Sequence, residues 1–546
     1  MGLLSLLWLA PVVGMVVILL APRRWSRAIA LLATLVSLGV ALAIGVGFQT
    51  QSGGLQFVER AAWIPAFHIE YFLGVDGLSV ALVLLTAVIS VIGVIASWRI
   101  EEESHRSGTE KSYFFLYLLL VAGMLGFFIA QDLILFYVFF ELTLLPMYFL
   151  IGYWGGPRRE YAAIKFFLYT LFGSVFMLVA ILALYFLSGP AGARTFAIPE
   201  LAAKNLPVWV LNWLWLGFYL GFAIKVPIFP FHTWLPDAHV EAPTPISVIL
   251  AGILLKMGTY GLARINLQVL GDASEGWWRF LAVLGVVNII YGAFCAMAQL
   301  DMKKLVAYSS IGHMGFVLLG IAARTPEGVN GAIFQMVSHG LLSGMLFLIV
   351  GVVYVRAHHR FIVYPEDPAL LQLYGVDPSK AGQKGFGGLA TVMPVYTFLM
   401  AVAFFGSLGL PGLSGFVGEF LSLLGAWKTY PLYALVSVIG VVIGAAYFLW
   451  TIQRMFLGQP NPGGERLARR SSPRAAGVGS AGAPGGPAWG DAPLGAGPLA
   501  GNGLELGGRS GDVDPLGDAV SRREKPRWGR RPVSETSKVW RPFCRS

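Results

Sequence analysis

Long apolar segments with few charges are the feature that most restricts how this chain can fold. A helix needs about 20 mostly apolar residues to cross roughly 30 Å of hydrocarbon. Segments of this kind recur from residue 3 to residue 457. Backbone polar groups in lipid must be paired within the protein, which limits spanning structures to helices and closed barrels. The pattern therefore predicts an all-α polytopic membrane protein.

About thirteen spans of suitable length can be assigned. They cover residues 3–21, 28–48, 77–98, 112–130, 132–153, 162–187, 209–228, 246–263, 278–298, 303–322, 330–355, 390–425 and 431–457. The twelfth is too long for one straight helix and contains Pro411 among several glycines. The seventh is interrupted at Pro227 and Pro230. Because proline removes a backbone donor and clashes with the preceding turn, both segments are predicted to be broken helices.

Composition agrees with a membrane protein. Hydrophobic residues make up 56% of the 546 residues and charged residues only 12%, whereas soluble domains carry about 25% charged residues. The first 20 residues lack a basic start, so we interpret them as a retained span rather than a signal peptide. The loops after odd-numbered spans are the richer in lysine and arginine, and Lys303 and Lys304 fit this bias. The positive-inside rule then predicts that the N-terminus lies outside a bacterial inner membrane.

The segment 459–546 differs from everything before it. It is rich in glycine, proline and arginine, has no apolar run of spanning length, and carries most of the formal net charge of +10. Such a composition is typical of disorder. The basic charge balance therefore reflects the tail and does not indicate nucleic-acid binding.

The sequence offers no cofactor site of its own. Two cysteines, Cys295 and Cys544, are too few for an iron–sulfur site or a disulfide framework. No G-x-G-x-x-G follows a strand pattern and no P-loop is present. We therefore expect the chain to bind no redox cofactor, nucleotide or metal.

Four charged residues lie away from the ends of the predicted spans or at a helix break. They are Glu141, Lys225, Lys256 and Glu419. A charge at such a depth costs several kcal/mol unless it faces protein or water, so the default interpretation is functional. The alternative for each is a structural charge pair. Lys225 stands two residues before Pro227, and a charge at a helix break is how transporters build midplane ion sites.

Histidines and one further lysine are weaker candidates. His313 and His339 lie within consecutive spans, where a lone histidine is often a hydrogen-bonded core residue. His232 and His239 flank a loop, and Lys165 begins a span after two arginines. The last three either take up protons from water or serve structure, by shaping the loop or by snorkelling to the membrane surface. Lysine, histidine and glutamate all exchange protons, whereas a sodium site would favour carboxylate and carbonyl oxygens.

The two helix breaks occupy matching positions. Each lies in the fourth member of a five-span set, residues 112–263 and 278–457, after an N-terminal region of residues 1–111. Five is odd, so the second set is inserted upside down relative to the first. Inverted repeats of this kind place ion sites near the middle of the membrane.

The motifs resemble those of the antiporter-like membrane subunits of respiratory NADH:quinone oxidoreductase, and most closely the subunit M type. Five stretches carry the resemblance: Glu141–Pro146, Lys165–Thr170, Lys225–His239, Ala307–Gly315 and Leu410–Glu419. The glutamate at the second break favours subunit M, because the sister subunits L and N usually have lysine there. The likeness covers roughly residues 70–457.

The resemblance implies a role for each matching residue. Glu141 and Lys225 would be the coupling pair, Lys256 the central relay, the two span histidines the connecting relay, and Glu419 the terminal proton site. Quinone reduction in other subunits would supply the energy. The expected partners are L-type and N-type neighbours and membrane lipid.

Family members normally have a fourteenth span, where this chain has the tail 459–546. We interpret the tail as a truncation or as a frame-shifted translation. Two other functions stay open. One is a subunit of a sodium/proton antiporter or of a membrane-bound hydrogenase, which share the fold. The other is an inert scaffold whose buried charges are structural.

Overall fold

The computed structural model describes residues 2–104, 106–190 and 192–460, all within one compact unit. The tail interpretation, from residue 461 onward, lies outside the described residues. The first part comprises α1 (Leu3–Leu20), α2 (Ser26–Gly47), β1 (Gln56–Ile64), β2 (Ile69–Val75), α3 (Gly77–Ala96), α4 (Ile100–Ser104), α5 (Glu110–Ile129), α6 (Leu133–Leu142), α7 (Leu144–Trp154) and α8 (Arg159–Leu187).

The middle part comprises α9 (Ile198–Ala202), α10 (Val208–Lys225), α11 (Trp234–Glu241), α12 (Thr244–Ile249), η4 (Leu250–Leu254), α13 (Leu255–Gly261), η5 (Leu262–Leu267), α14 (Glu275–Met297), α15 (Met302–Ala323) and α16 (Pro326–Ala357). The last part comprises α17 (Pro368–Leu373), α18 (Leu389–Val392), α19 (Pro394–Ser407), α20 (Ser414–Thr429) and α21 (Pro431–Met455). Four short 3-10 turns are Arg23–Trp25, Pro65–Phe67, Ser97–Arg99 and Pro378–Lys380. The all-α polytopic class is confirmed.

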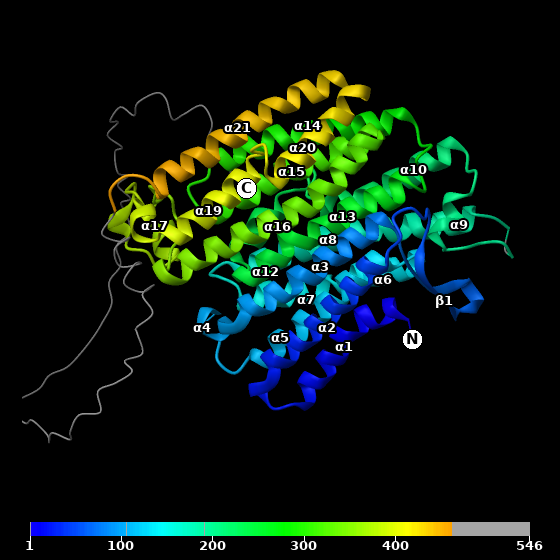
Figure 1. Cartoon of the computed structure of the whole chain (residues 1–546), viewed down its shortest axis with the longest axis horizontal. Helices are drawn as coiled ribbons and strands as arrows, with labels where there is room; N and C mark the ends of the chain where they lie inside the picture. Colours follow the sequence, from blue (N-terminus) through cyan, green and yellow to red (C-terminus); the bar gives the residue numbers. More distant parts are fainter. Residues whose placement is uncertain (1, 105, 191, 461–546) are drawn as a thin grey trace, which may run out of the picture. The chain divides into compact units, whose positions relative to one another are not determined.

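Twelve helical segments among the described residues are long and apolar enough to cross a membrane. Each matches a predicted span. The remaining predicted span, 390–425, forms the separate helices α19 and α20, and neither of these reaches spanning length. Figure 1 shows the long helices lying side by side. α14 packs against α15 and α21, and α16 packs against α15 and α20.

The first broken helix has its backbone groups satisfied by a neighbouring span. α10 ends at Lys225 and α11 begins at Trp234. Asn288 of α14 accepts a hydrogen bond from Phe229 N at 2.8 Å and donates one to Pro227 O at 3.3 Å. Non-helical backbone at membrane depth needs such partners because no lipid group supplies them.

The second break depends on two glycines. α19 ends at Ser407 and α20 begins at Ser414. Between them Gly409 has φ +78° and Gly412 has φ +94°. Left-handed backbone of this kind is open to glycine and costly for most other residues. Pro411 between them cannot continue a helix, so the chain turns here and restarts.

Two features of the spans were not predicted. Predicted span 5 is two helices, because α6 ends and α7 begins around Thr143, next to Glu141. Predicted span 8 is π-helical on both sides of α13, in η4 and η5. π-helical turns are rare and mostly found at functional sites, and no hydrophobic pattern announces them.

A two-stranded antiparallel sheet was also not predicted, in the loop between the second and third spans. β1 pairs with β2 in a register that places Arg60 opposite Phe72. Glu59 of β1 accepts hydrogen bonds from Leu4 N at 2.7 Å and Ser5 N at 3.2 Å, at the start of α1. The hairpin thereby supplies the free N–H groups of that helix end with an acceptor.

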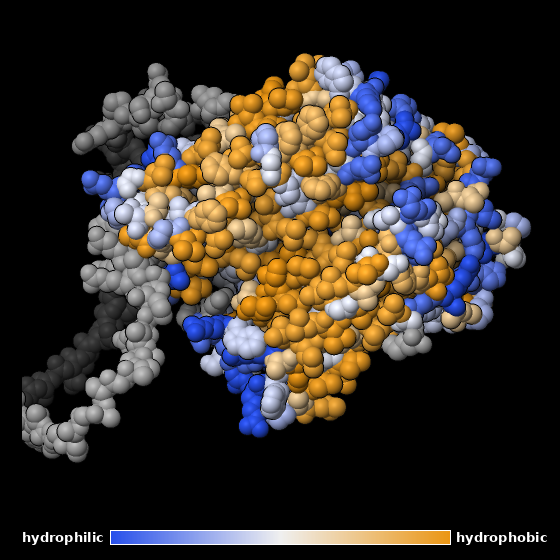
Figure 2. All heavy atoms as spheres, viewed as in Figure 1, coloured by the Kyte–Doolittle hydropathy of each residue, from blue (hydrophilic) through white to orange (hydrophobic). Residues whose placement is uncertain are grey.

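The exposed surface is largely apolar. Figure 2 shows hydrophobic residues over the broad middle of this face, with hydrophilic residues gathered towards its ends. Exposed apolar side chains include Val46 at 88% and Trp213 at 71%. A soluble monomer rarely exposes contiguous apolar surface on this scale. The distribution fits a protein surrounded by lipid.

Candidate functional site

Lys256 lies at the centre of a buried polar chain. It belongs to α13, between the two π-helical segments, and is 0% exposed. Its Nζ donates to Ala251 O at 2.5 Å and is hydrogen-bonded to His339 Nδ1 at 2.6 Å. The backbone acceptor comes from η4, where helix widening changes the hydrogen-bond pattern. A buried ammonium needs such partners to offset the loss of water.

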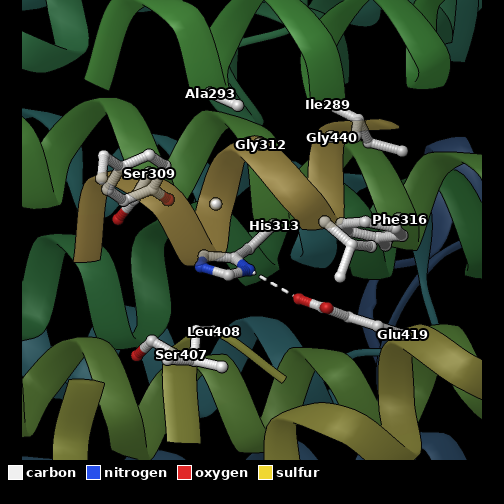
Figure 3. Close-up of a pocket in the computed structure, with 13 residues that line it drawn as sticks. Ile289, Ala293, Ser309, Gly312, His313, Phe316, Ser407, Leu408, Glu419 and Gly440 are labelled. Carbon is white, nitrogen blue, oxygen red and sulfur yellow. Dashed lines mark hydrogen bonds and ion pairs between the residues drawn. The ribbon is translucent and has the colours of Figure 1, made fainter. Parts of the chain in front are cut away.

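His339 leads from Lys256 to the second predicted half. Its ring lies 5.5 Å from the ring of His313, measured between centroids. His313 Nδ1 is hydrogen-bonded to Glu419 Oε1 at 2.8 Å, as Figure 3 shows. Gln335 Nε2 also donates to Glu419 Oε1, at 3.2 Å. The structure thus brings four sequence-predicted residues into one sequence of neighbours, from Lys256 to Glu419.

The His313–Glu419 end of this sequence of neighbours has room for water. His339 Nε2 and His313 Nε2 are both buried without a hydrogen-bond partner. A cavity of about 20 Å³ is lined by His313, Glu419 and Ser309 among others (Figure 3). That volume accommodates about one water molecule. A water molecule in this cavity would lie against His313 and Glu419 and could hydrogen-bond to either side chain.

Glu141 and Lys225 come near each other without pairing. Lys225 is 2% exposed, and its Nζ donates to Thr143 Oγ1 at 3.3 Å and lies 4.7 Å from the centre of the Phe140 ring. Glu141 Oε1 is buried with no hydrogen-bond partner. Among the described residues, no direct ion pair joins the two. The two residues of the expected coupling pair are therefore not bonded to each other in this structure.

The predicted uptake residues have different surroundings. Lys165 Nζ donates to Asp237 Oδ2 at 2.8 Å, so it forms an ion pair instead of snorkelling freely. His232 Nε2 is hydrogen-bonded to Tyr291 OH at 3.2 Å. His239 is fully buried, stacks on Phe347, and has both ring nitrogens without a hydrogen-bond partner.

A larger cavity of about 330 Å³ opens at the end of α11. Its lining includes Glu241, Lys303 and Arg360. Lys303 Nζ donates to Ala242 O at 2.6 Å. Its ammonium is therefore buried and hydrogen-bonded, and it is not simply one of the basic loop charges that set the orientation. Arg360 pairs with Asp301 at 2.7 Å. None of these groups except the lysine drew attention in the sequence.

Tyr374 connects the loop before α18 to this cavity wall. Its hydroxyl donates to Glu241 Oε1 at 3.2 Å. Burial, together with the neighbouring Glu241 carboxylate, raises the pKa of Tyr374 to about 12. The hydroxyl therefore stays protonated at neutral pH and keeps Glu241 bonded.

Asp237, Gln335 and Thr143 are partners that the sequence analysis did not assign. Asp237 stands inside the recognisable Lys225–His239 stretch, so its acidic side chain beside two histidines was a usable signal. Gln335 and Thr143 carry no such signal, because amides and hydroxyls are common in spans. No group of three or more His, Cys, Asp or Glu suited to a metal occurs within the described residues.

Comparisons with known proteins agree with this arrangement. Residues 130–444 match the model of the family described as NADH:quinone oxidoreductase/Mrp antiporter, TM. NADH-quinone oxidoreductase subunit M of Rhodobacter capsulatus is 43% identical over 473 residues, covering 84% of this chain and 87% of the relative. NAD(P)H-quinone oxidoreductase chain 4 1 of Synechococcus sp. (strain JA-3-3Ab) is 42% identical and covers 84% of each chain.

Two solved structures resemble the fold. A chain of respiratory complex I from Thermus thermophilus with bound NADH superposes with TM-score 0.73 at 32% identity, covering 86% of this chain and 94% of that chain. A chain of the Mrp complex from Dietzia sp. DQ12-45-1b superposes with TM-score 0.71 at 22% identity, covering 85% and 82%. The second likeness concerns the fold alone.

Proposed function

This chain belongs to the NADH:quinone oxidoreductase/Mrp antiporter transmembrane family, and from that membership we propose that it is the M-type, proton-translocating subunit of an NADH:quinone oxidoreductase. The relatives that carry the subunit M name span most of both chains. In this proposal the subunit performs no redox step of its own. Quinone reduction in other subunits supplies the energy, and subunits of the L and N type are its proposed neighbours in the membrane.

One observation carries the proposal: an almost continuous line of proton-exchanging side chains crosses the interior. Lys256 is hydrogen-bonded to His339, the His339 ring lies 5.5 Å from the His313 ring between centroids, and His313 is hydrogen-bonded to Glu419. If these charged groups served structure alone, each would be expected to pair directly with an opposite charge. Here two imidazole nitrogens along the line have no hydrogen-bond partner in the protein, and His313 borders a cavity that accommodates about one water molecule. Such a line can pass a proton in steps, each between neighbouring groups.

Glu141 and Lys225 would control when a proton enters the line of buried side chains. A carboxylate close to an ammonium favours the charged lysine, and moving it away favours release of the proton. The open geometry, with Lys225 on Thr143 and a ring face, corresponds to the state in which this stabilisation is weak. If a conformational change in a neighbouring subunit moved Glu141, it would thereby change the protonation state of Lys225.

Protons are proposed to enter through the 330 Å³ cavity. The N-terminus is proposed to lie on the opposite side of the membrane from this cavity. The cavity lies at the end of the spans that the basic loops place inside. His239, one residue before Val240 on its wall, is buried with both nitrogens free of hydrogen bonds. It is the histidine best placed to pass protons from this cavity inward.

The test uses the whole complex in proteoliposomes with Glu419→Gln, which keeps the size of the side chain and removes its proton site. Expected results are unchanged NADH oxidation with a soluble electron acceptor and a sharp loss of proton translocation driven by quinone. The matched control is Glu327→Gln, which alters a half-exposed carboxylate paired with Lys428. It should pump normally. Normal pumping by Glu419→Gln in an assembled complex would reject the proposed terminal site.

The family also contains Mrp antiporters, so sodium/proton exchange is the second candidate. The subunit M names of the relatives at 42–43% identity favour the first function. Pumping in the absence of sodium distinguishes the two. An antiporter subunit would need sodium, whereas the proposed proton line contains histidines and a lysine, which bind protons and not sodium.

A further inference from the structure

Arg264 forms a buried ion pair at the end of span 8, about two helical turns beyond Lys256. It belongs to η5 and is 3% exposed. Its two terminal nitrogens bind Asp76 at 2.6 and 2.7 Å. Asp76 stands directly before α3 and also accepts a hydrogen bond from Ser79 N at 3.0 Å. A bidentate pair of this geometry is among the stronger ionic contacts in proteins.

Every donor of the Arg264 guanidinium is used. Nε donates to Tyr260 OH at 3.1 Å, and the terminal nitrogens also donate to Gln268 Oε1 at 2.9 Å and Ser79 Oγ at 2.8 Å. Burial of the Asp76 carboxyl opposes its ionisation, but hydrogen bonds and charge from Arg264 outweigh this, so the pKa of Asp76 lies below its ordinary value. The pair is therefore ionised and fully occupied.

An aromatic layer surrounds the inner side of the pair. Tyr260 lies 5.5 Å from Phe127 and 5.2 Å from Phe128, and Phe127 lies 4.2 Å from Phe136, all between ring centroids. All four side chains are 0% exposed. Tyr260 OH also donates to Phe128 O at 3.0 Å. The layer offers no spare polar atom to a water molecule at the tyrosine.

The position of this assembly relative to Lys256 gives it a role. Lys256, Tyr260 and Arg264 follow at four-residue intervals, so Arg264 stands about 12 Å further along the span than Lys256. Span 8 ends here while α3 begins, and α6 begins directly after α5 ends. These ends share one side of the membrane, which the proposed orientation places outside. The assembly therefore separates the Lys256 site from the outer water.

We propose that Arg264, held by Asp76, is a positioning residue that seals the first half of the subunit against the outside. Protons on Lys256 then have no exit along span 8 and pass sideways through His339 towards Glu419. This inference rests on the proposed function, because a seal matters only if Lys256 carries protons.

Replacing Arg264 would let water into the seal, because its polar partners would lose their hydrogen-bond donor. Arg264→Met leaves buried Ser79, partly exposed Asp76 and exposed Gln268 without their shared donor, so the site is open to water from the Gln268 side. Unpaired polar groups in such a site are costly and attract water. Water in reach of Lys256 on one side and the outer solution on the other provides a path for protons, which bypasses the second half.

The experiment measures passive proton leak through the whole complex in proteoliposomes, with no NADH present and a potassium diffusion potential imposed. We expect Arg264→Met to raise the leak about tenfold, corresponding to a barrier lower by about 1.4 kcal/mol. Arg264→Lys, which keeps the charge next to Asp76, should restore most of the seal. The matched control is Arg324→Met, which removes a more exposed arginine from its pair with Glu275.

The possible outcomes separate a seal from a merely structural pair. A structural role lowers thermal stability in Arg264→Met and leaves the leak unchanged, which would overturn the proposal. If Arg264→Met does not assemble, Asp76→Asn replaces it, with the same two readouts. The double variant Arg264→Met with Lys256→Met should lose the leak again. If Lys256→Met alone pumps normally, the proposed function fails; a tight Arg264→Met complex contradicts only the seal.

Discussion

At the scale of the residue, the two buried lysines differ in what holds them. Lys256 has two acceptors at 2.5 and 2.6 Å. Lys225 has one hydroxyl at 3.3 Å and a ring face. An ammonium buried with few partners keeps its charge only at a high cost. Lys225 is thus the group whose proton responds most to a change nearby.

Thr143→Val tests this difference. It keeps the shape of the side chain and removes the hydroxyl that Lys225 contacts, so we expect about 1–3 kcal/mol less stabilisation of the charged lysine. Proton translocation per NADH oxidised should fall. Thr170→Val is the control, because the Thr170 hydroxyl is equally buried but bonds only carbonyls of its own helix. Equal pumping by the two variants would contradict the role given to Thr143.

At the scale of the element, the second helix break positions the terminal carboxylate. The turn between α19 and α20 needs two left-handed glycines, but only one of them adjoins Glu419. A Cβ at Gly409 would lie 3.0 Å from Glu419 Oε2, whereas a Cβ at Gly412 would meet nothing within 4 Å. Both positions require a left-handed backbone, but only a side chain at Gly409 would contact Glu419.

Gly409→Ala and Gly412→Ala therefore form a matched pair. Each should destabilise the turn by about 1–2 kcal/mol through the left-handed backbone. Only Gly409→Ala should also displace Glu419 from His313 and lower proton translocation. Thermal unfolding of the complex and protons pumped per NADH measure the two effects separately. A similar loss of pumping in both variants would mean that the turn as a whole, and not the carboxylate contact, matters.

At the scale of the whole molecule, the relay joins elements that lie far apart in the chain. Lys256 belongs to the first predicted half, while His313 and Glu419 belong to the second. No proton route from Lys256 through these groups exists without both halves packed together. The proposed relay is therefore a series of steps, and we expect the loss of any step to stop proton transfer through it.

A series has a clear signature in double variants. Lys256→Met, Glu419→Gln and the combination of both should lose proton translocation to the same extent, because residues that act as a unit are not additive. Protons per NADH in proteoliposomes provide the measurement. Partial losses that multiply in the double variant would indicate two parallel routes through the subunit.

Much of the fold followed from hydrophobic pattern and proline. Twelve predicted spans match helices of spanning length, and the two predicted broken helices are broken. The pattern works because lipid forces backbone groups to pair locally, so each span is determined by its own residues. The division into inverted halves and the roles of the site residues stay predictions. The β1–β2 hairpin and the π-helical segments depend on pairing between segments, which one local pattern does not encode.

The sequence by itself determined which charged groups lie inside the membrane, because their burial follows from the apolar residues around them. Only the tertiary structure decided which of these groups are neighbours. In the folded protein Lys256 is hydrogen-bonded to His339, and His313 to Glu419. Arg264 is paired with Asp76, whereas Glu141 and Lys225 are not bonded to each other. These contacts join residues separated by 83 to 188 positions. Distances of that kind arise from helix packing, which no single segment specifies.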